Sequence, residues 1–360
     1  MGASASIPET VDAAAAAALM GSASLTFDAA KFTELAGESG TLTTAEVNAY
    51  LNSALPNSAF VFIKPHANTA AAQAYVKGAL EAAGCSVLAE GPIAGTDIDS
   101  KKLIDQHYYA IASKATILKP KDLAVPKDKF EEKFGEGWEA VLAEDRAVNA
   151  MDACERFGLD AQQLEVEWRK CEPAGKVVKF GGGFYCGLME VGDKKLYVFN
   201  AFFMSMRSKF VGEANSIYYY SVEWDPAKLS WADFRGKTLG PTNPADAPAG
   251  AIRAEILARW QEFGLSAEPN QGDNGVHASA SPLEGLAEKM NWLEKGVADE
   301  TFGAALLRNG LSEETVKAWS VDPRVDMEGG AASIFDTLED LSVGDCLAKC
   351  VEVNGFKPAE

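Results

Sequence analysis

Apolar positions recur along this chain with two periods, one typical of strands and one typical of helices. Strand-like patterns predict β-strands over residues 60–65 and 216–224. Helical spacing covers residues 72–83, a short strand pattern surrounds Val87, and helical spacing returns over residues 99–112. This alternation of strands and helices is consistent with a mixed α/β fold.

The segments that flank this alternation are mainly helical in pattern. A short helix is expected over residues 13–18, and two more are expected between residues 27 and 55. In the second of these two, Val47 and Tyr50 belong to one apolar face. Helical spacing returns near the end of the chain, over residues 334–341. We therefore expect helical extensions on both sides of the α+β part.

The charge of the chain limits its partners. With 33 Lys and Arg against 52 Asp and Glu, the formal net charge is −19 at neutral pH. Nucleic acids and anionic membranes attract positively charged surfaces, so neither is expected as an electrostatic partner. No apolar run approaches the roughly 20 residues that a membrane-spanning helix requires.

The cysteines predict free thiols. All six are scattered, and none forms a C-x-x-C pair; they are Cys85, Cys154, Cys171, Cys186, Cys346 and Cys350. Zinc sites and dense disulfide frameworks both need closer or more regular spacing. The pattern favours reduced thiols in a cytoplasmic protein.

The first six residues allow two interpretations. Met1-Gly2-Ala3-Ser4-Ala5-Ser6 fits the pattern for N-myristoylation of Gly2, and it also fits a tail of small residues. No Lys or Arg occurs before Lys31 and no Cys before Cys85, so a second anchoring signal is missing. One acyl chain binds a membrane with K of about 10⁴ M⁻¹. Weak membrane association is therefore expected only if Gly2 is acylated.

The segment of residues 274–281, Asn-Gly-Val-His-Ala-Ser-Ala-Ser, holds the strongest candidate for chemistry. It contains His277, one of three histidines, among small and hydroxyl residues, and Glu288 follows eleven positions later. Small neighbours let a phosphoryl group approach the ring, hydroxyls such as that of Ser279 can support it, and a carboxylate can fix its tautomer. Taken alone, the same pattern also fits a solvated loop histidine or a helix cap.

Further motifs stand in order around this segment. A strand ends in Lys64-Pro65, a His107-Tyr108 pair follows, and a Thr-Asn-Pro-Ala-Asp run begins at Thr242 and ends in Ile252-Arg253. After His277, Glu288 lies in a segment that ends at Trp292. With these motifs in this order, the chain resembles the nucleoside diphosphate kinase family. Several ordered motifs are a far stronger signal than any one of them.

The resemblance implies phosphotransfer between nucleoside triphosphates and diphosphates through a phosphohistidine. His277 would accept the γ-phosphoryl group, and Glu288 would orient its ring. Mg²⁺ would arrive with the nucleotide, held mostly by phosphate oxygens and water. The implied nucleotide and phosphate ligands are Lys64, Thr242, Arg253 and Asn274, with Tyr108 beside the histidine and Phe202 stacked on the base. The stacking role of Phe202 has an alternative, because residues 197–203 could equally form one strand of the core.

Several positions depart from the family pattern, and one of them concerns a predicted phosphate ligand. The family has a second arginine before the Thr-Asn-Pro run, and the matching position here is Gly236, with Arg235 one residue earlier. A shift of one residue on an α-helix turns a side chain through about 100°. Arg235 can therefore serve as a phosphate ligand only if the helix is locally reset.

The resemblance also divides the chain into parts. It predicts a kinase-like α+β domain of ferredoxin-like type over residues 58–114 and 201–295, in which an antiparallel sheet carries helices on one face in the split β-α-β arrangement. An insertion over residues 115–200 would interrupt this domain. Residues 1–57 and 296–360 would be extensions. Within the insertion, a charged helical stretch over residues 129–157 precedes a glycine turn and a hairpin over residues 184–199.

Two functions remain open at this point. The first is an active phosphotransferase, which the family implies to be a homo-oligomer or part of a larger protein assembly. The alternative is a weakly active or inactive nucleotide-binding or structural assembly protein on the same fold. The large additions favour the alternative, and the retained chemical residues favour the enzyme.

Overall fold

A computed structural model describes residues 9–23, 25–327 and 330–354 of this chain, which forms two compact units. The first unit comprises Met1–Ile63, Thr69–Gly91 and Tyr218–Glu360, and the second comprises Lys64–Asn68 and Pro92–Ile217. Each unit is described by itself below. The predicted acylation site, Gly2, lies outside the described residues.

The first unit is built on an antiparallel sheet with the predicted connectivity. Its strands are, in chain order, β3 (Asn57–Ile63), β4 (Ser86–Ala94), β9 (Ser216–Trp224) and β10 (Val276–Ala278), and their spatial order is β10-β3-β9-β4. Strand β3 runs antiparallel to both β9 and β10. Helix α4 (Ala70–Ala82) connects the first two strands, and helix α14 (Ile252–Ala258) lies between the last two. This is the split β-α-β pattern, so the predicted α+β fold is confirmed.

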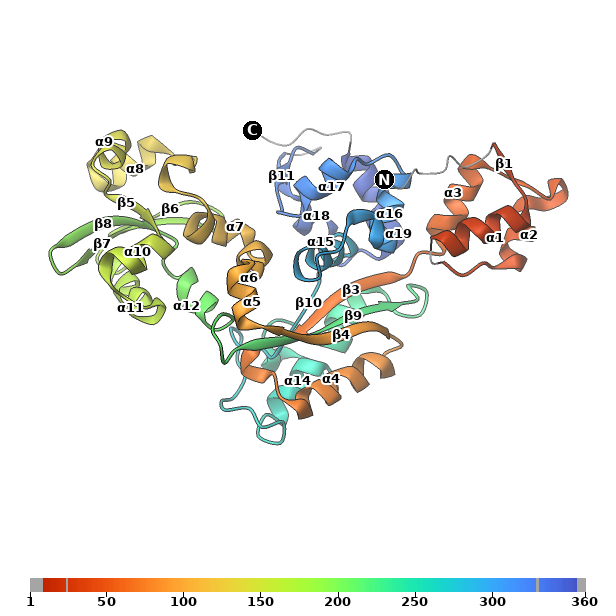
Figure 1. The fold of residues 1–360 in the computed structure, drawn as a ribbon, viewed down its shortest axis with the longest axis horizontal. Helices are drawn as coiled ribbons and strands as arrows, with labels where there is room; N and C mark the ends of the chain where they lie inside the picture. Colours follow the sequence, from red (N-terminus) through yellow and green to blue (C-terminus); the bar gives the residue numbers. More distant parts are fainter. Residues whose placement is uncertain (1–8, 24, 328–329, 355–360) are drawn as a thin grey trace. The chain divides into compact units, whose positions relative to one another are not determined.

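Helices cover both faces of this sheet. Helices α4 and α14 lie on one face, and α15 (Pro282–Trp292) lies on the other (Figure 1). The expectation of helices on one face only was therefore wrong. The physical reason is visible in β3, which is buried along its whole length because its continuous apolar run needs a cover on each side. On the α15 side, the ring of Trp292 stacks on that of Phe60, with centroids 6.1 Å apart.

The N-terminal extension forms three short helices. They are α1 (Ala13–Ser22), α2 (Ala29–Ala36) and α3 (Thr44–Ser53). Helix α3 begins directly after Thr43, because Thr43 and Glu46 form a reciprocal capping box. Tyr50 of its apolar face is 1% exposed. A two-stranded sheet of β1 (Thr10–Val11) and β2 (Leu42–Thr43) joins the beginning of the extension to this cap.

The C-terminal extension is also helical and shares a hydrophobic cluster with the N-terminal one. Its helices are α16 (Thr301–Arg308), α17 (Glu313–Trp319), α18 (Ile334–Leu338) and α19 (Val343–Val353), with a short pair of β11 (Arg324–Val325) and β12 (Ala332–Ser333) between α17 and α18. The cluster includes Tyr50 and Leu55 together with Leu283, Leu306 and Leu338. The two extensions are therefore joined through a common core that also contains residues of α15.

The second unit contains a mixed sheet that was only partly predicted. Its strands are β5 (Ala147–Asn149), β6 (Val177–Gly181), β7 (Phe184–Val191) and β8 (Lys194–Phe199), in the order β5-β8-β7-β6. The predicted hairpin is present as β7 and β8. Strand β8 ends at Phe199 and Asn200 has φ of 47°, so residues 197–203 are not one strand. Helix α12 (Phe203–Ser208) follows.

Two expected helices in the second unit are broken into pieces. The charged stretch over residues 129–157 is α8 (Lys127–Phe134), α9 (Trp138–Ala143), β5 and α10 (Ala150–Phe157), with α11 (Ala161–Cys171) after it. Gly135 ends α8 in a left-handed conformation with φ of 71°. Likewise, residues 99–112 form α5 (Gly95–Ser100), α6 (Leu103–His107) and α7 (Tyr109–Ala112), because Lys102 has φ of 55°.

The second unit includes more of the chain than the predicted insertion over residues 115–200. It extends from Pro92 to Ile217 and also contains the short segment Lys64–Asn68. A buried ion pair helps to explain the difference. Arg207 of α12 donates to both carboxylate oxygens of Asp105 in α6 at 2.9 and 3.0 Å. The two residues are 4% and 0% exposed, so the segments on either side of the insertion are bound to each other within this unit. None of the helices in the described residues is long and apolar enough to cross a membrane.

Candidate active site

His277 lies at the middle of β10, in the first unit. It is paired in register with Phe62 of β3, and the two rings stack with centroids 4.7 Å apart. The side chain of His277 is 17% exposed. The ring is therefore held face to face with that of Phe62 while part of it remains accessible.

Glu288 and Ser279 complete a three-residue set around this ring. The Nε2 atom of His277 lies 2.5 Å from Oε1 of Glu288, and the hydroxyl of Ser279 donates to Oε2 of Glu288 at 2.5 Å. Glu288 is 5% exposed and Ser279 is fully buried. Because Glu288 holds Nε2, the nitrogen that faces away from this carboxyl is Nδ1. This is the orientation predicted from the sequence for a histidine oriented by a carboxylate.

The local sequence explains why these three side chains meet. His277 and Ser279 are two positions apart on an extended segment, so both point to the same face of the sheet. Ser281 begins α15 by accepting the amide hydrogen of Glu284 at 3.2 Å, with Pro282 in the first helical position. Glu288 follows Ser281 by seven residues, which is about two helical turns, so it returns to the side of the sheet.

A glycine lets α15 approach the sheet closely enough for this contact. A Cβ atom at Gly285 would lie 2.6 Å from the carbonyl oxygen of Ser58 and 3.4 Å from the hydroxyl of Ser279. A Cβ atom cannot approach a carbonyl oxygen as closely as 2.6 Å without a shift of the backbone. Glycine at this position therefore sets the distance between α15 and β3.

Burial governs the protonation of Glu288. Loss of water raises the pKa of this carboxyl to about 8, while the hydrogen bond from Ser279 and the charge of Lys289 act in the opposite direction. The pKa of Glu284, one turn earlier, is also raised to about 8, mainly by burial and then by Glu288. The carboxyl of Glu288 is thus expected to lose its proton at mildly alkaline pH.

Three of the predicted ligands lie together at the start of β10. Arg253, which is 8% exposed, donates from Nε and Nη2 to the carbonyl oxygen of Val276 at 3.1 and 2.8 Å and from Nη1 to that of Gly240 at 2.8 Å. Asn274 donates from Nδ2 to the carbonyl oxygen of Thr242 at 2.9 Å. Arg253, Asn274 and Thr242 are therefore tied to the residue that precedes His277 or to the loop beside it.

The side-chain oxygen of Asn274 is able to accept a further hydrogen bond. This Oδ1 atom is buried and has no hydrogen-bond partner among the residues that the structure describes. Buried polar atoms are nearly always satisfied, so each exception needs an explanation. A hydroxyl donor, such as that of a sugar, would satisfy it.

Arg235 lies on a locally reset helix, but it already has two acidic partners. Residues Phe234–Leu239 form a π-helical segment, which accommodates one extra residue in a helical turn. The Nη1 atom of Arg235 contacts carboxylate oxygens of Glu339 at 2.6 Å and Asp340 at 2.7 Å. A phosphate would have to compete with these carboxylates, so the role of Arg235 in phosphate binding remains a prediction.

The remaining predicted ligands, Lys64, Tyr108 and Phe202, belong to the second unit. Lys64 directly follows β3 in the chain and precedes a short 3₁₀ turn. The ring of Tyr108 meets that of His107 edge to face at 4.5 Å. Phe202 packs against Trp168, with centroids 6.1 Å apart, which gives this ring a partner within its own unit. The nucleotide contacts of these three residues remain predictions.

The site residues of the first unit suit a metal ion that is carried by a ligand. Their one carboxylate, Glu288, is engaged on both oxygens by His277 and Ser279. Mg²⁺ usually keeps several waters and binds phosphate oxygens when it accompanies a nucleotide. Mg²⁺ that arrives with a nucleotide would not require this carboxylate as a ligand, and its binding remains a prediction.

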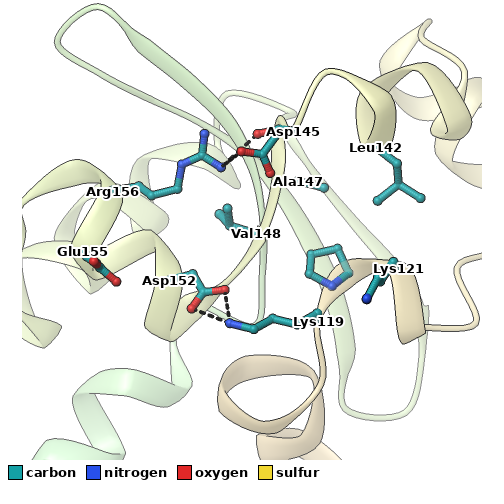
Figure 2. A pocket seen from close by; sticks show the side chains of 10 residues that line it. Lys119, Lys121, Leu142, Asp145, Ala147, Val148, Asp152, Glu155 and Arg156 are labelled. Atoms are coloured by element: carbon teal, nitrogen blue, oxygen red, sulfur yellow. Dashed lines mark hydrogen bonds and ion pairs between the residues drawn. The ribbon is translucent and has the colours of Figure 1, made fainter.

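The second unit contains a pocket of about 590 Å³ that no sequence motif predicted. Figure 2 shows Ala147 and Val148 of β5 within it, and two ion pairs at its sides. One pair joins Lys119 to Asp152 at 2.6 Å, and the other joins Arg156 to Asp145 at 3.0 Å. A volume of several hundred Å³ suits a small molecule. Its lining comes from two nearby segments, residues 119–121 and 142–156, and neither segment carries a recognised binding motif.

The comparisons with known proteins do not identify the chain: no family model matches it, and no curated protein matches it.

Proposed function

We propose that this protein transfers phosphoryl groups between nucleoside triphosphates and diphosphates through a phosphohistidine at His277. The observation that carries the proposal is the set formed by His277, Glu288 and Ser279, in which both oxygens of a buried carboxyl are engaged and one of them holds Nε2 of the ring. The location of this set in a β-α-β-β-α-β sheet, beside Thr242, Arg253 and Asn274, supports the resemblance to nucleoside diphosphate kinases.

In the first half-reaction, Nδ1 of His277 attacks the γ-phosphorus of a triphosphate. A bond forms between this nitrogen and phosphorus, and the bond from phosphorus to the bridging oxygen breaks, so the diphosphate leaves with that oxygen. The phosphorylated ring carries a proton on Nε2 and is cationic. The Glu288 carboxylate stabilises this charge at 2.5 Å from Nε2.

In the second half-reaction, a terminal oxygen of another diphosphate attacks the phosphorus of the phosphohistidine. The nitrogen–phosphorus bond breaks, and the electron pair returns to Nδ1. Mg²⁺ bound to the nucleotide would neutralise the phosphate oxygens, and the chain's own residues would orient the ring and the sugar. Oligomer formation and assembly with other proteins remain expectations from the resemblance.

Labelling tests the proposal directly. The protein is incubated with γ-labelled ATP and Mg²⁺, and acid-labile, alkali-stable label is measured in the wild type and in His277→Ala. His66→Ala serves as the matched control because it removes another of the three histidines. We expect label in the wild type and the control and none in His277→Ala. Equal label in all three proteins would place the chemistry elsewhere.

A second candidate function is nucleotide binding without transfer, as part of a structural assembly. It is favoured by the guanidinium groups of Arg253 and Arg235, which already contact backbone carbonyls and carboxylates respectively. Calorimetric titration with ADP separates the two functions. Binding of ADP by a protein that takes up no label at near-stoichiometric concentration would favour this second function.

A further inference from the structure

The C-terminal extension is bound to the loop that follows His277. The amide of Asp340 donates to the carbonyl oxygen of Ala280 at 3.0 Å. The two carboxylates of Glu339 and Asp340 meet at Arg235, which comes from the π-helical segment before the Thr-Asn-Pro run. A single arginine thus anchors the turn that contacts residues 279–281.

A second set of hydrogen bonds joins the same elements. The indole of Trp231 donates from Nε1 to the carbonyl oxygen of Ser279 at 3.3 Å. The amide of Trp231 in turn donates to the hydroxyl of Ser342 at 3.0 Å. Next to Ser342, the amide of Val343 donates to Oδ1 of Asn57, the first residue of β3, at 2.8 Å. The extension therefore connects the loop after His277 to the start of the central strand.

Residues 279–281 hold the carboxyl groups of Glu288 and Glu284 through hydrogen bonds. The hydroxyl of Ser279 donates to Glu288 and also accepts the amide hydrogen of Phe60 at 2.9 Å. The amide of Ala280 donates to Oε1 of Glu284 at 3.0 Å. A displacement of the loop would move the hydroxyl that fixes Glu288, and Glu288 fixes the ring nitrogen of His277.

We propose that Arg235, Glu339 and Asp340 form a positioning clamp that holds residues 279–281 and thereby fixes the hydrogen-bonded state of the His277–Glu288 pair. The catalytic consequence rests on the proposed function, whereas the effect on the ring of His277 does not. The three clamp residues are positioning residues, since none of them contacts the ring.

The geometry of the clamp allows its charge to be removed without unfolding the extension. Leu338 and Val343, on either side of the turn, are 0% and 3% exposed in the hydrophobic cluster of the first unit. Burial of these side chains keeps α18 and α19 docked when the ion pair is absent. Asp340 has φ of 64°, a conformation that Asn adopts as readily as Asp. Asp340→Asn therefore removes the charge and keeps the backbone.

The test uses the full chain labelled with ¹⁵N at histidine, in which only three rings contribute signals. Ring ¹⁵N shifts distinguish a nitrogen that carries hydrogen from one that does not, and His277→Asn assigns the signal. The spectra are compared at a pH above the titration of the pair for the wild type, Arg235→Ala, Arg235→Lys and the double variant Glu339→Gln/Asp340→Asn. Glu313→Gln is the matched control, because it removes the Glu313–Lys317 ion pair of 2.6 Å from the same extension.

We expect the wild type and the control to show one tautomer with hydrogen on Nε2. Arg235→Ala and the double variant should show a mixture, and Arg235→Lys should return towards the wild-type signal. If the double variant does not fold, Arg235→Ala and the single variant Asp340→Asn decide the question by the same measurement. Unchanged His277 signals in the folded variants would overturn the clamp.

Transfer kinetics provide a second readout and separate this inference from the proposed function. Misplacement of the pair should lower kcat by about 10- to 100-fold with little change in KM. A rise in KM with kcat unchanged would mean that Arg235 binds phosphate, which would overturn the positioning role. If the wild type transfers no phosphate at all, the proposed function fails, and the ring signals still decide whether the clamp acts.

Discussion

Replacing Glu288 by Gln should remove the main pH dependence of phosphate uptake at His277. When the His277–Glu288 pair carries two protons, one of them lies between Nε2 and the carboxyl, and the other is on Nδ1. Nδ1 then has no lone pair with which to attack phosphorus. After one proton leaves, the carboxylate accepts Nε2–H and Nδ1 presents its lone pair. Since burial raises the pKa of Glu288 to about 8, the labelling rate should rise about tenfold per pH unit below the transition and level off above about pH 8.

The magnitude of the change follows from the contact that is lost. Gln cannot titrate, so its rate should be nearly constant over this range. It also replaces the charge-assisted hydrogen bond of 2.5 Å to Nε2 by a neutral one, which stabilises the cationic phosphohistidine less. Hydrogen bonds to charged groups contribute about 1.5–3 kcal/mol. The plateau rate should therefore fall by about 10- to 150-fold relative to the wild type.

The assay measures the rate of label uptake in a single turnover at a series of pH values, and each reaction is stopped without acid because the label is acid-labile. Glu284→Gln is the matched control, since burial raises the pKa of Glu284 to about 8 as well but its carboxyl contacts the amide of Ala280 rather than the ring. The control should keep the wild-type profile. A flat wild-type profile, or a rising profile retained in Glu288→Gln, would refute the reasoning.

Three other changes have definite expected outcomes. Arg253→Lys replaces the planar fork, whose three nitrogens donate to Gly240 and Val276, by a single nitrogen. It should therefore lower the free energy of unfolding by about 1–3 kcal/mol and weaken triphosphate binding. Denaturant titration and calorimetry check this, and unchanged values would mean that the guanidinium contacts are unimportant. Gly285→Ala places a Cβ atom 2.6 Å from the carbonyl oxygen of Ser58, so α15 must shift, and both the melting temperature and the label on His277 should fall. The control Gly344→Ala adds an atom that meets nothing within 4 Å, so it should change neither quantity. Burial raises the pKa values of Glu284 and Glu288 to about 8. Their protonated forms therefore stabilise the folded state below the ordinary pKa range of glutamate, and this stabilisation is lost as pH rises through about 8. The free energy of unfolding, measured by denaturant titration, should fall between about pH 5 and pH 8, and it should fall less in the Glu284→Gln/Glu288→Gln double variant.

The sheet and the central pair were predictable because their signals are local. The run from Phe60 to Ile63 is apolar throughout, and a strand buried on both faces has this composition. His277, Ser279 and Glu288 lie within twelve residues of each other, so strand and helix periods alone bring them to one side of the sheet. Within the first unit, distances confirm the predicted contact of His277 with Glu288.

What the sequence did not reveal depends on partners distant in the chain or on single backbone conformations. Arg235 meets Glu339 and Asp340 more than a hundred residues later, and no local pattern distinguishes these carboxylates from other acidic residues. The helices expected over residues 99–112 and 129–157 break at Lys102 and Gly135, both with positive φ. Lys102 gives no sign of such a break in the sequence, because a lysine is a common residue inside helices. Gly135 does give one, since glycine is the usual residue in the left-handed position that ends a helix.

Discharge of the phosphorylated protein tests the central claim most directly. The protein is first labelled with γ-labelled ATP, freed of nucleotide, and then mixed with unlabelled GDP or with buffer alone. The account predicts that label located on His277 by mass spectrometry passes to GDP and yields labelled GTP, while label in buffer alone persists on the protein. Label that is found on another residue, or that stays on His277 in the presence of excess GDP, would contradict it.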